Sequence, residues 1–265
     1  MRPLAIVLLG AVERWLDRVI AAGLEPWVRA ADLSGAARPQ RGEVATVDAL
    51  LELRERLEPP RIFLLDGPAD AVDAVIDPAS REIEPGDLVL DLAPSWWCDT
   101  LRRHRRLRHR SLFHLDGAEL AGPGGRVLLV SGDARGLELA RPVLEALAAP
   151  GRLVPAGGPA AAHWAAEVAA GLATARAQAE SEARALLEAF PNALATGPVG
   201  AALGLGTAAA DPRALWLPDD ALRLQAPTPL LAQAAMLELG CALDEERERP
   251  PPPRLGPFQL PEEIL

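Results

Sequence analysis

The sequence lacks two residue types on which many enzyme mechanisms depend. It contains no lysine and no tyrosine, so all 27 of its basic residues are arginines. A mechanism that uses a lysine base, a lysine Schiff base or a tyrosine acid is therefore excluded. The two cysteines, Cys98 and Cys241, provide neither a disulfide framework nor the spacing of metal ligands. We therefore expect no metal site.

Long apolar runs are missing as well. No segment reaches the ~18 apolar residues that a membrane span needs. The run from Leu4 to Val12 is followed by an acidic, arginine-rich segment and not by the cleavage site of a signal peptide. We interpret this run as a buried strand and expect a cytoplasmic protein without a membrane span. The formal net charge of −10 argues against general affinity for nucleic acid.

The apolar residues that are present suffice for a core. Of the 265 residues 49% are hydrophobic, which is enough for one or two domains. In the first half of the chain, strand-like runs alternate with helical patterns, which is typical of a parallel sheet with crossover helices. The predicted strands span 4–9, 25–29, 61–65, 87–92, 112–116, 126–131 and 152–155, and the predicted helices span 13–22, 47–57 and 135–148.

The second half of the chain is predicted to be helical. An alanine-rich run at 159–190, interrupted only by Gly171, predicts one long buried helix. A second helix is predicted at 226–243, and the proline-rich segment that ends the chain is predicted to be extended. The predicted bounds are 1–157 for the α/β domain, 158–248 for the helical domain and 249–265 for the tail.

Five segments follow one another in the order and spacing of a known family. They are EPGDLVLDLAPSWWCDTLRR at 84–103, LFHLDGAELAGP at 112–123, VLLVSGDARGLELARPVLEAL at 127–147, GPAAAHWAAEVAAGL at 158–172 and ALRLQAPTPLLAQAAMLE at 221–238. Together they resemble the short bacterial type of 6-phosphogluconate dehydrogenase, within the β-hydroxyacid dehydrogenase superfamily. The resemblance implies an α/β Rossmann-type N-terminal domain, an all-helical C-terminal domain and a homodimer built on the helices. The activity that it implies is NADP-linked oxidation of a sugar acid, followed by decarboxylation.

The dinucleotide-binding turn of that family is degenerate in this chain. Its pattern is Gly-x-Gly-x-x-Gly, in which the glycines let the backbone approach a pyrophosphate at the start of a helix. We align these positions with Val7, Leu9 and Val12, and a shift of register to Gly10 recovers one glycine. Glu13 adds a negative charge where a phosphate would bind. We therefore expect no bound cofactor.

The catalytic residues that the resemblance implies are also missing. The family carries a lysine base, an asparagine and a glutamate acid on its central helix. The corresponding positions here are Ala166, Ala170 and Ala173. Two polar residues remain, His163 and Ser95, and we interpret His163 as a histidine at a helix start that is bonded to the backbone.

Two further stretches of the family position nicotinamide and substrate. The Gly-Gly-Asn-Ser turn becomes LAPS at 92–95, in which Pro94 has no side-chain amide to offer. The Ser-Gly-Gly substrate loop becomes Leu120, Ala121 and Gly122. The chain therefore retains the pattern of the fold without the polar groups that would contact a ligand.

One stretch is unusually basic, LRRHRRLRHR at 101–110. The resemblance places it on an exposed crossover helix, with candidate contact residues Arg102, Arg103, Arg105, Arg106, Arg108 and Arg110. It is either a solvated helix face that acidic neighbours partly neutralise, or a docking face for an acidic protein or a nucleic-acid backbone.

The proline-rich tail is a second candidate contact segment. Phe258, Leu260 and Leu265 have the spacing of anchors for a peptide that binds in a groove. The alternative is a tail that wraps the sister subunit of a dimer.

These observations favour a catalytically inactive relative of 6-phosphogluconate dehydrogenase that acts as a structural, assembly or regulatory subunit, in a homodimer or a larger protein complex. One alternative is an NAD(P)-dependent oxidoreductase with an altered site and substrate, which would use NADP. Another is an anion- or nucleic-acid-binding module that uses the helix at 101–110. We expect the cleft above Leu9 and Gly10 to be closed by side chains such as Leu8, Leu9 or Trp96.

Overall fold

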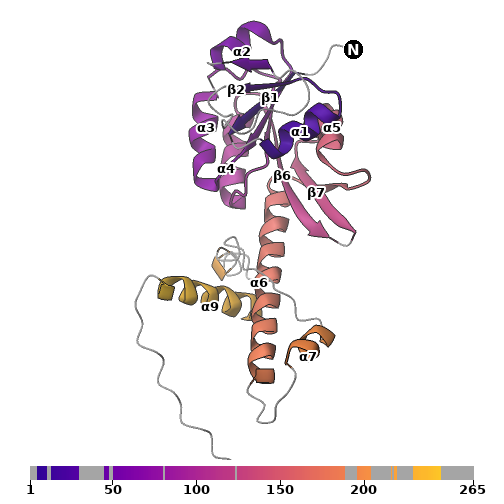
Figure 1. Cartoon of the computed structure of the whole chain (residues 1–265). Helices are drawn as coiled ribbons and strands as arrows, with labels where there is room; N and C mark the ends of the chain where they lie inside the picture. Colours follow the sequence, from indigo (N-terminus) through magenta and orange to yellow (C-terminus); the bar gives the residue numbers. More distant parts are fainter. Residues whose placement is uncertain are drawn as a thin grey trace, which may run out of the picture.

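The computed structural model of the chain contains one large sheet with helices on both faces, and a helical part that extends from it (Figure 1). The structure describes residues 5–10, 13–29, 45–47, 50–79, 81–122, 124–188, 196–203, 216, 218–219 and 229–245. Among these residues, no helix is long and apolar enough to cross a membrane.

The sheet has eight strands in the order β3-β2-β1-β4-β5-β6-β7-β8. Neighbouring strands are parallel, except that β6 and β7 form an antiparallel pair. The strands are β1 (Ala5–Gly10), β2 (Pro26–Arg29), β3 (Ala45–Val47), β4 (Arg61–Asp66), β5 (Leu88–Asp91), β6 (Phe113–Gly122), β7 (Gly125–Gly132) and β8 (Leu153–Gly157). The strand order reverses between β1 and β4, which is where open α/β sheets bind ligands, outside the carboxyl ends of the strands.

Helices cover both faces of this sheet. They are α1 (Glu13–Ala21), α2 (Leu50–Arg56), α3 (Val72–Ala79), α4 (Trp97–Arg108), α5 (Ala134–Leu147), α6 (Ala161–Glu188), α7 (Thr196–Ala202) and α9 (Pro229–Glu245), with a short 3-10 helix η2 (Ala69–Ala71) before α3. On one face, Ile6 and Leu8 of β1 pack in a core with α1 and α5. On the other face, Val7 and Leu9 pack in a core with α2, α3 and α4. This alternation explains why β1 reads as a continuous apolar run, since both of its faces are buried.

The predicted α/β Rossmann-type domain and the helical part that follows it are confirmed. All seven predicted strands form, and β3, which the sequence pattern did not indicate, is added at the edge of the sheet. The predicted long helix corresponds to α6, which leads away from the sheet, and α9 packs against it (Figure 1). The domain bounds at 157 and 248 stay a prediction, and the tail with Phe258 and Leu260 lies outside the described residues.

One local expectation is wrong. The strand predicted at 112–116 continues to Gly122 and forms a hairpin with β7, in which Leu120 pairs with Val127 and Ala121 with Arg126. The segment that aligns with the family's substrate loop is therefore strand and not loop. The hairpin register can run this far because the connection around Gly124, at φ +79°, is tight.

Candidate functional site at the carboxyl edge of the sheet

Three aspartates lie on adjacent strands at the carboxyl edge of the sheet. Asp66 ends β4, Asp91 ends β5, and Asp116 on β6 is the register partner of Asp91. Asp91 and Asp116 are fully buried, and the side chain of Asp66 is 8% exposed. Because a buried carboxylate is costly unless it is paired and hydrogen-bonded, the partners of these three residues decide what the edge can do.

The first helix of the chain supplies the partners of Asp66. Its Oδ2 accepts hydrogen bonds from Nε of Arg14 and from Nε1 of Trp15, both at 2.7 Å. Arg14 and Trp15 lie in the first turn of α1, and the Arg14 guanidinium also covers the Trp15 ring at 4.5 Å from its centroid. In sheets of this type the start of this helix is where a dinucleotide phosphate binds. Here a carboxylate of the chain itself contacts two side-chain donors of that helix start.

Gly10 permits this arrangement. It lies beside Asp66 in the β1–β4 register and has φ +86°, a conformation that favours glycine. A Cβ atom on Gly10 would collide with the backbone carbonyl oxygen of Asp66. The glycine that survives from the dinucleotide-binding turn is therefore needed for the close approach of two strand ends.

The end of β1 at Gly10 permits a second register for the turn. Because the strand ends at Gly10, a Gly-x-Gly-x-x-Gly pattern anchored there falls on Leu8, Gly10 and Glu13. This is one residue later than Val7, Leu9 and Val12, the last of which lies outside the described residues. One glycine out of three is present in this second register, as the sequence indicated, and the choice between the two registers stays a prediction.

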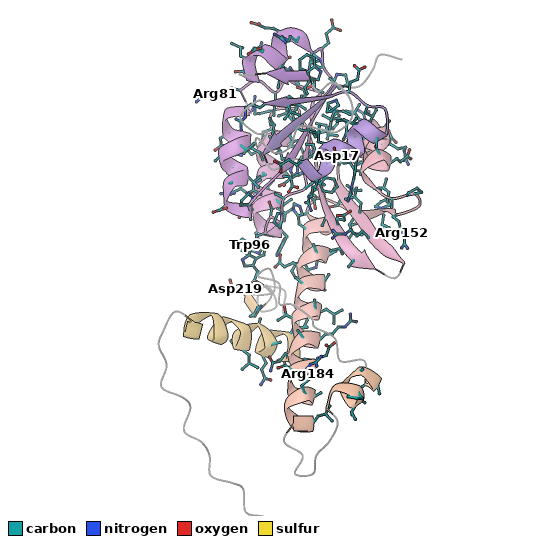
Figure 2. All side chains as sticks on the ribbon, in the orientation of Figure 1. Asp17, Arg81, Trp96, Arg152, Arg184 and Asp219 are labelled. Carbon is teal, nitrogen blue, oxygen red and sulfur yellow. The ribbon has the colours of Figure 1, made fainter. Side chains whose placement is uncertain are left out.

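These residues do not fit a dinucleotide. Leu8 is a fully buried core residue, Glu13 adds a negative charge to the first turn of α1, and Asp66 takes the indole N–H of Trp15 and Nε of Arg14. The expected closure by Leu8, Leu9 or Trp96 is wrong, because the two leucines belong to the cores beneath the helices. Trp96 lies at the end of α4 that points toward the helical part (Figure 2). At the start of α1, the structure describes contacts of Asp66 with Arg14 and Trp15.

The second aspartate, Asp91, belongs to a buried polar cluster with Ser95 and Arg103. Its Oδ2 lies 3.4 Å from both Nη1 of Arg103 and Oγ of Ser95, and its Oδ1 accepts from the backbone N–H of Ala93 at 3.1 Å. Arg103 Nη1 also donates to Ser95 Oγ at 2.8 Å. Burial raises the pKa of Asp91, although the charges of His163 and Arg103 oppose that rise.

Arg103 departs from its expected place on an exposed helix face. It is 2% exposed and reaches from Asp91 to Asp73 of α3, which it contacts through Nε at 3.1 Å and Nη2 at 3.2 Å. Burial alone would raise the pKa of Asp73, but the hydrogen bond and charge of Arg103, together with Arg102 and Arg106, hold it below its usual range. Arg103 is therefore a structural link between β5, α3 and α4.

Two further arginines of α4 are matched by acidic neighbours. Arg102 pairs with Asp73 at 2.7 Å, and Arg106 pairs with Asp77 of the same helix, α3, at 2.9 Å. Arg105, Arg108 and Arg110 are exposed, and Arg110 donates to the carbonyl oxygen of Ile83. The dense positive charge of the sequence is thus distributed between internal ion pairs and a smaller exposed face.

His163 is bonded differently from the sequence interpretation. Its Nδ1 lies 2.7 Å from Oγ1 of Thr100 on α4, so its side chain contacts another side chain and not the backbone. Thr100 is in turn bonded to the carbonyl oxygen of Trp96 at 3.1 Å. His163 is 2% exposed, which places it inside the contact between α4 and α6.

The third aspartate, Asp116, caps the long helix α6 together with Ser131 of β7. Asp116 accepts from the backbone N–H groups of Ala160 at 2.8 Å and His163 at 3.1 Å, and from Oγ of Ser131 at 2.7 Å. Ser131 Oγ accepts from the N–H of Ala162 at 2.8 Å. These bonds satisfy the N–H groups that a helix start leaves without partners. Sequence reasoning missed this cap, although an aspartate and a serine at the ends of predicted strands were its signal.

The positions on α6 that align with the family's catalytic residues are buried or half-buried. Ala166 and Ala170 are 2% and 4% exposed, and Ala173 is half-buried. Glu167, which sequence reasoning did not single out, is 1% exposed and interacts with other residues of the protein. Within the described part of the chain, no group of three or more histidine, cysteine or acidic side chains could hold a metal ion. The polar side chains of this region therefore join elements to one another.

A family model described as the NAD binding domain of 6-phosphogluconate dehydrogenase matches residues 32–164, about half of the chain. The chain therefore belongs to the 6-phosphogluconate dehydrogenase family, as the resemblance indicated. The match begins after β1, α1 and β2, so it does not include the turn at Gly10.

Curated relatives match over part of their length. The decarboxylating 6-phosphogluconate dehydrogenase of Cunninghamella elegans is 30% identical over 125 residues, which cover 45% of this chain and 25% of that protein. The NAD(+)-dependent enzyme of Haloferax volcanii is 31% identical over 153 residues, which cover 55% of this chain and 50% of that protein. The chain thus spans between a quarter and a half of the length of these relatives.

Solved structures share the fold over most of the chain. The 3-hydroxyisobutyrate dehydrogenase of Mycobacterium tuberculosis superposes with a TM-score of 0.72 at 18% identity, covering 92% of this chain and 95% of that chain. The 6-phosphogluconate dehydrogenase of Plasmodium falciparum superposes with a TM-score of 0.66 at 16% identity, covering 93% and 65%. At these identities the likeness establishes the arrangement of the elements.

Proposed function

We propose that this chain is a non-catalytic member of the 6-phosphogluconate dehydrogenase family, acting as a structural, assembly or regulatory subunit. The observation that carries the proposal is the Asp66 carboxylate, held by Arg14 and Trp15 at the crossover point between β1 and β4. A dinucleotide phosphate would have to displace this carboxylate and then lie beside Glu13. Both steps oppose binding by repulsion between like charges.

The closed face of α6 supports the same proposal. A dehydrogenase of this type needs an acid or base that reaches its substrate, and proton transfer requires hydrogen-bond distance. At the corresponding positions this chain has Ala166 and Ala170, which are buried and carry no ionisable group. Ser95 and His163 are engaged with Arg103 and Thr100.

The enzymatic part of the proposal is tested by a dehydrogenase assay on the full chain. The substrates are 6-phosphogluconate and 3-hydroxyisobutyrate, each with NAD and with NADP, and the readout is the absorbance of the reduced nicotinamide. We expect no reduction above that of a blank without protein. Reduction that is lost in His163→Ala would contradict the proposal, because a contaminating enzyme would not respond to that substitution.

The assembly part of the proposal is supported by apolar side chains that stand exposed on the helical part. Val168 and Leu172, one turn apart on α6, are 39% and 43% exposed, and Met236 on α9 is 66% exposed. Adjacent exposed apolar side chains, such as Val168 and Leu172, are a feature of protein contacts. We expect the chain to sediment as a dimer or larger species, and Leu172→Glu to release monomers. Leu51→Glu on α2, equally apolar and 53% exposed, is the matched control and should leave the mass unchanged.

The oxidoreductase alternative has one observation in its favour. Nε2 of His163 is buried and has no hydrogen-bond partner among the described residues, which leaves a ring nitrogen available in a remodelled site. That alternative requires NADP or NAD to raise the melting temperature of the protein by mass action. An unchanged melting temperature at saturating concentrations of both would count against it.

A further inference from the structure

A groove lies at the opposite end of α1 from Asp66. It is formed by the last turn of α1, the β6–β7 hairpin and the end of α5, and its volume is about 690 Å³. This lies within the range of roughly 300–1,000 Å³ that is usual for small-molecule pockets. The groove does not share residues with the carboxyl edge, so it is a separate candidate site.

Two arginines are held at this groove by one buried carboxylate. Oε1 of Glu119 accepts from Nη1 of Arg18 at 2.8 Å, and Oε2 accepts from Nη1 of Arg126 at 2.8 Å. The side chain of Glu119 is 7% exposed, whereas Arg18 and Arg126 are 35% and 68% exposed. Burial alone would raise the pKa of Glu119, but the two arginines outweigh it and hold the pKa below its usual range.

This arrangement orients the guanidinium groups toward a ligand. The bonds to Glu119 use the Nη1 nitrogen of each arginine, and a guanidinium carries five N–H donors in a rigid fork. Arg18 also donates to the carbonyl oxygen of Leu147 at 2.9 Å, which offsets the negative end of α5. Donors fixed in this way lose little conformational entropy when they bind an oxyanion.

Most of the other residues that line the groove are apolar, and many of them are short. Its lining includes Leu128 and Leu147, which are 2% and 1% exposed, and short alanine side chains from the ends of α1 and α5. Glu145, an exposed residue, contributes a carboxylate to the lining. The groove thus offers an apolar surface next to oriented donors, and its lining holds two carboxylates, Glu119 paired with the arginines and Glu145 opposing an anion.

We propose that this groove binds a small organic anion, with its carboxylate or phosphate on Arg18 and Arg126 and its apolar body against the alanine-lined surface. The pairing is charge-assisted, and guanidinium groups bind both oxyanions in a bidentate manner. The site needs neither a dinucleotide nor catalysis, so it is independent of the function proposed above.

The test is an NMR titration of the isotope-labelled full chain with benzoate and with phenyl phosphate. Benzyl alcohol, which has the same ring and no charge, is the neutral probe. We expect saturable shifts of the amide signals of Leu128 and Ala146 with the two anions, and at least tenfold weaker binding of the alcohol. The stronger of the two anions identifies the preferred oxyanion.

Three variants assign the binding to the groove. Arg126→Gln should weaken the binding of both anions at least tenfold, and Glu145→Gln should strengthen it, because a repelling carboxylate is removed. Arg105→Gln, on the exposed face of α4, is the matched control and should bind as the unaltered chain does. The proposal is overturned if the groove signals do not shift, if the alcohol binds as well as the anions, or if Arg126→Gln binds as tightly as the unaltered chain.

Discussion

At each end of α1 a carboxylate is held by two side-chain donors, but the surroundings of the two carboxylates differ. At its start, the Asp66 carboxylate is bound by Arg14 and Trp15. At its end, the Glu119 carboxylate is bound by Arg18 and Arg126. The first arrangement lies at the helix start, where we propose that it opposes a dinucleotide phosphate, and the second lines a groove.

The difference lies in the donors and in what surrounds them. An indole carries a single N–H, and Trp15 gives it to Asp66, so no donor of that side chain is left for a ligand. Trp15 is also 1% exposed, whereas Arg126 is 68% exposed. Arg14, the second partner of Asp66, is 47% exposed and bonds through Nε, so the two ends differ in one respect: a buried indole is a partner at the start of α1, whereas both partners at its end are guanidinium groups.

Removal of the α6 cap is expected to have the largest effect on the carboxyl edge. Asp116→Ala leaves two backbone N–H groups and the hydroxyl of Ser131 without their acceptor, all of them buried. We expect the free energy of unfolding to fall by about 3–5 kcal/mol, measured by urea denaturation. Asp99→Ala, at an exposed acidic residue of α4, is the control and should change it little. A loss below about 1 kcal/mol would mean that the edge is not the structural junction described here.

Loss of the Asp66 contact at the start of α1 is expected to have the next largest effect on the free energy of unfolding. Asp66→Ala leaves Nε1 of Trp15 without an acceptor in a buried position, which should cost about 1–3 kcal/mol in urea denaturation. Asp17→Ala, on the exposed side of the same helix, should have almost no effect. If both variants unfold at the same urea concentration as the unaltered chain, the closure by Asp66 is too weak to exclude a ligand.

The buried histidines predict how the edge responds to pH. His114 on β6 is fully buried, its ring lies 5.6 Å from that of His104, and burial holds its pKa well below the usual value. His104, His163 and Arg103 add to this effect through their charges. In the unfolded chain His114 takes up a proton at about pH 6.5, whereas in the folded chain it stays neutral at that pH. The free energy of unfolding should therefore fall below pH 6.5, by at most ~1.4 kcal/mol per pH unit for this residue.

His114→Leu tests this directly. Both ring nitrogens of His114 lack a hydrogen-bond partner in the described structure, so leucine loses no bond there. The variant should unfold with a shallower dependence on pH between about 5 and 6.5. An unchanged slope in that window would show that His114 does not contribute to it.

The smallest effect on stability is expected at the groove. Arg126→Gln removes an exposed partner of Glu119, and such pairs contribute about 0.2–1 kcal/mol. We expect the urea midpoint to shift little, while the binding of organic anions weakens as described above. A large loss of stability would mean that Arg126 holds the hairpin in place, and the contrast between the two ends of α1 would disappear.

Much of the fold was predictable because strand patterning is local. The apolar run of β1 and the turn before β5 at Gly86 define the strands within one or two residues. The hairpin extension of β6 was not predictable in this way, because the pairing of Leu120 with Val127 depends on a neighbouring strand. The loss of the family's ionisable residues on α6 could be read directly from Ala166 and its neighbours.

The tertiary contacts of Asp66 and of Arg103 could not be predicted from the sequence. Asp66 is 51 residues from Trp15 along the chain, and neither residue belongs to a motif. The same is true of Arg103, which the sequence presents as one of six similar arginines on one helix. Its burial follows from Asp73 and Asp91, which approach it from two other elements. Pairings of this kind are set by tertiary packing and not by local sequence.

The most direct test of the account is a calorimetric titration of the full chain with NADPH, with Asp66→Ala measured in parallel. We predict no saturable heat for the unaltered chain at millimolar NADPH, because Asp66 and Glu13 oppose the phosphates. Binding of one NADPH per chain with micromolar affinity would contradict the account, since it would show that the carboxyl edge is an open cofactor site.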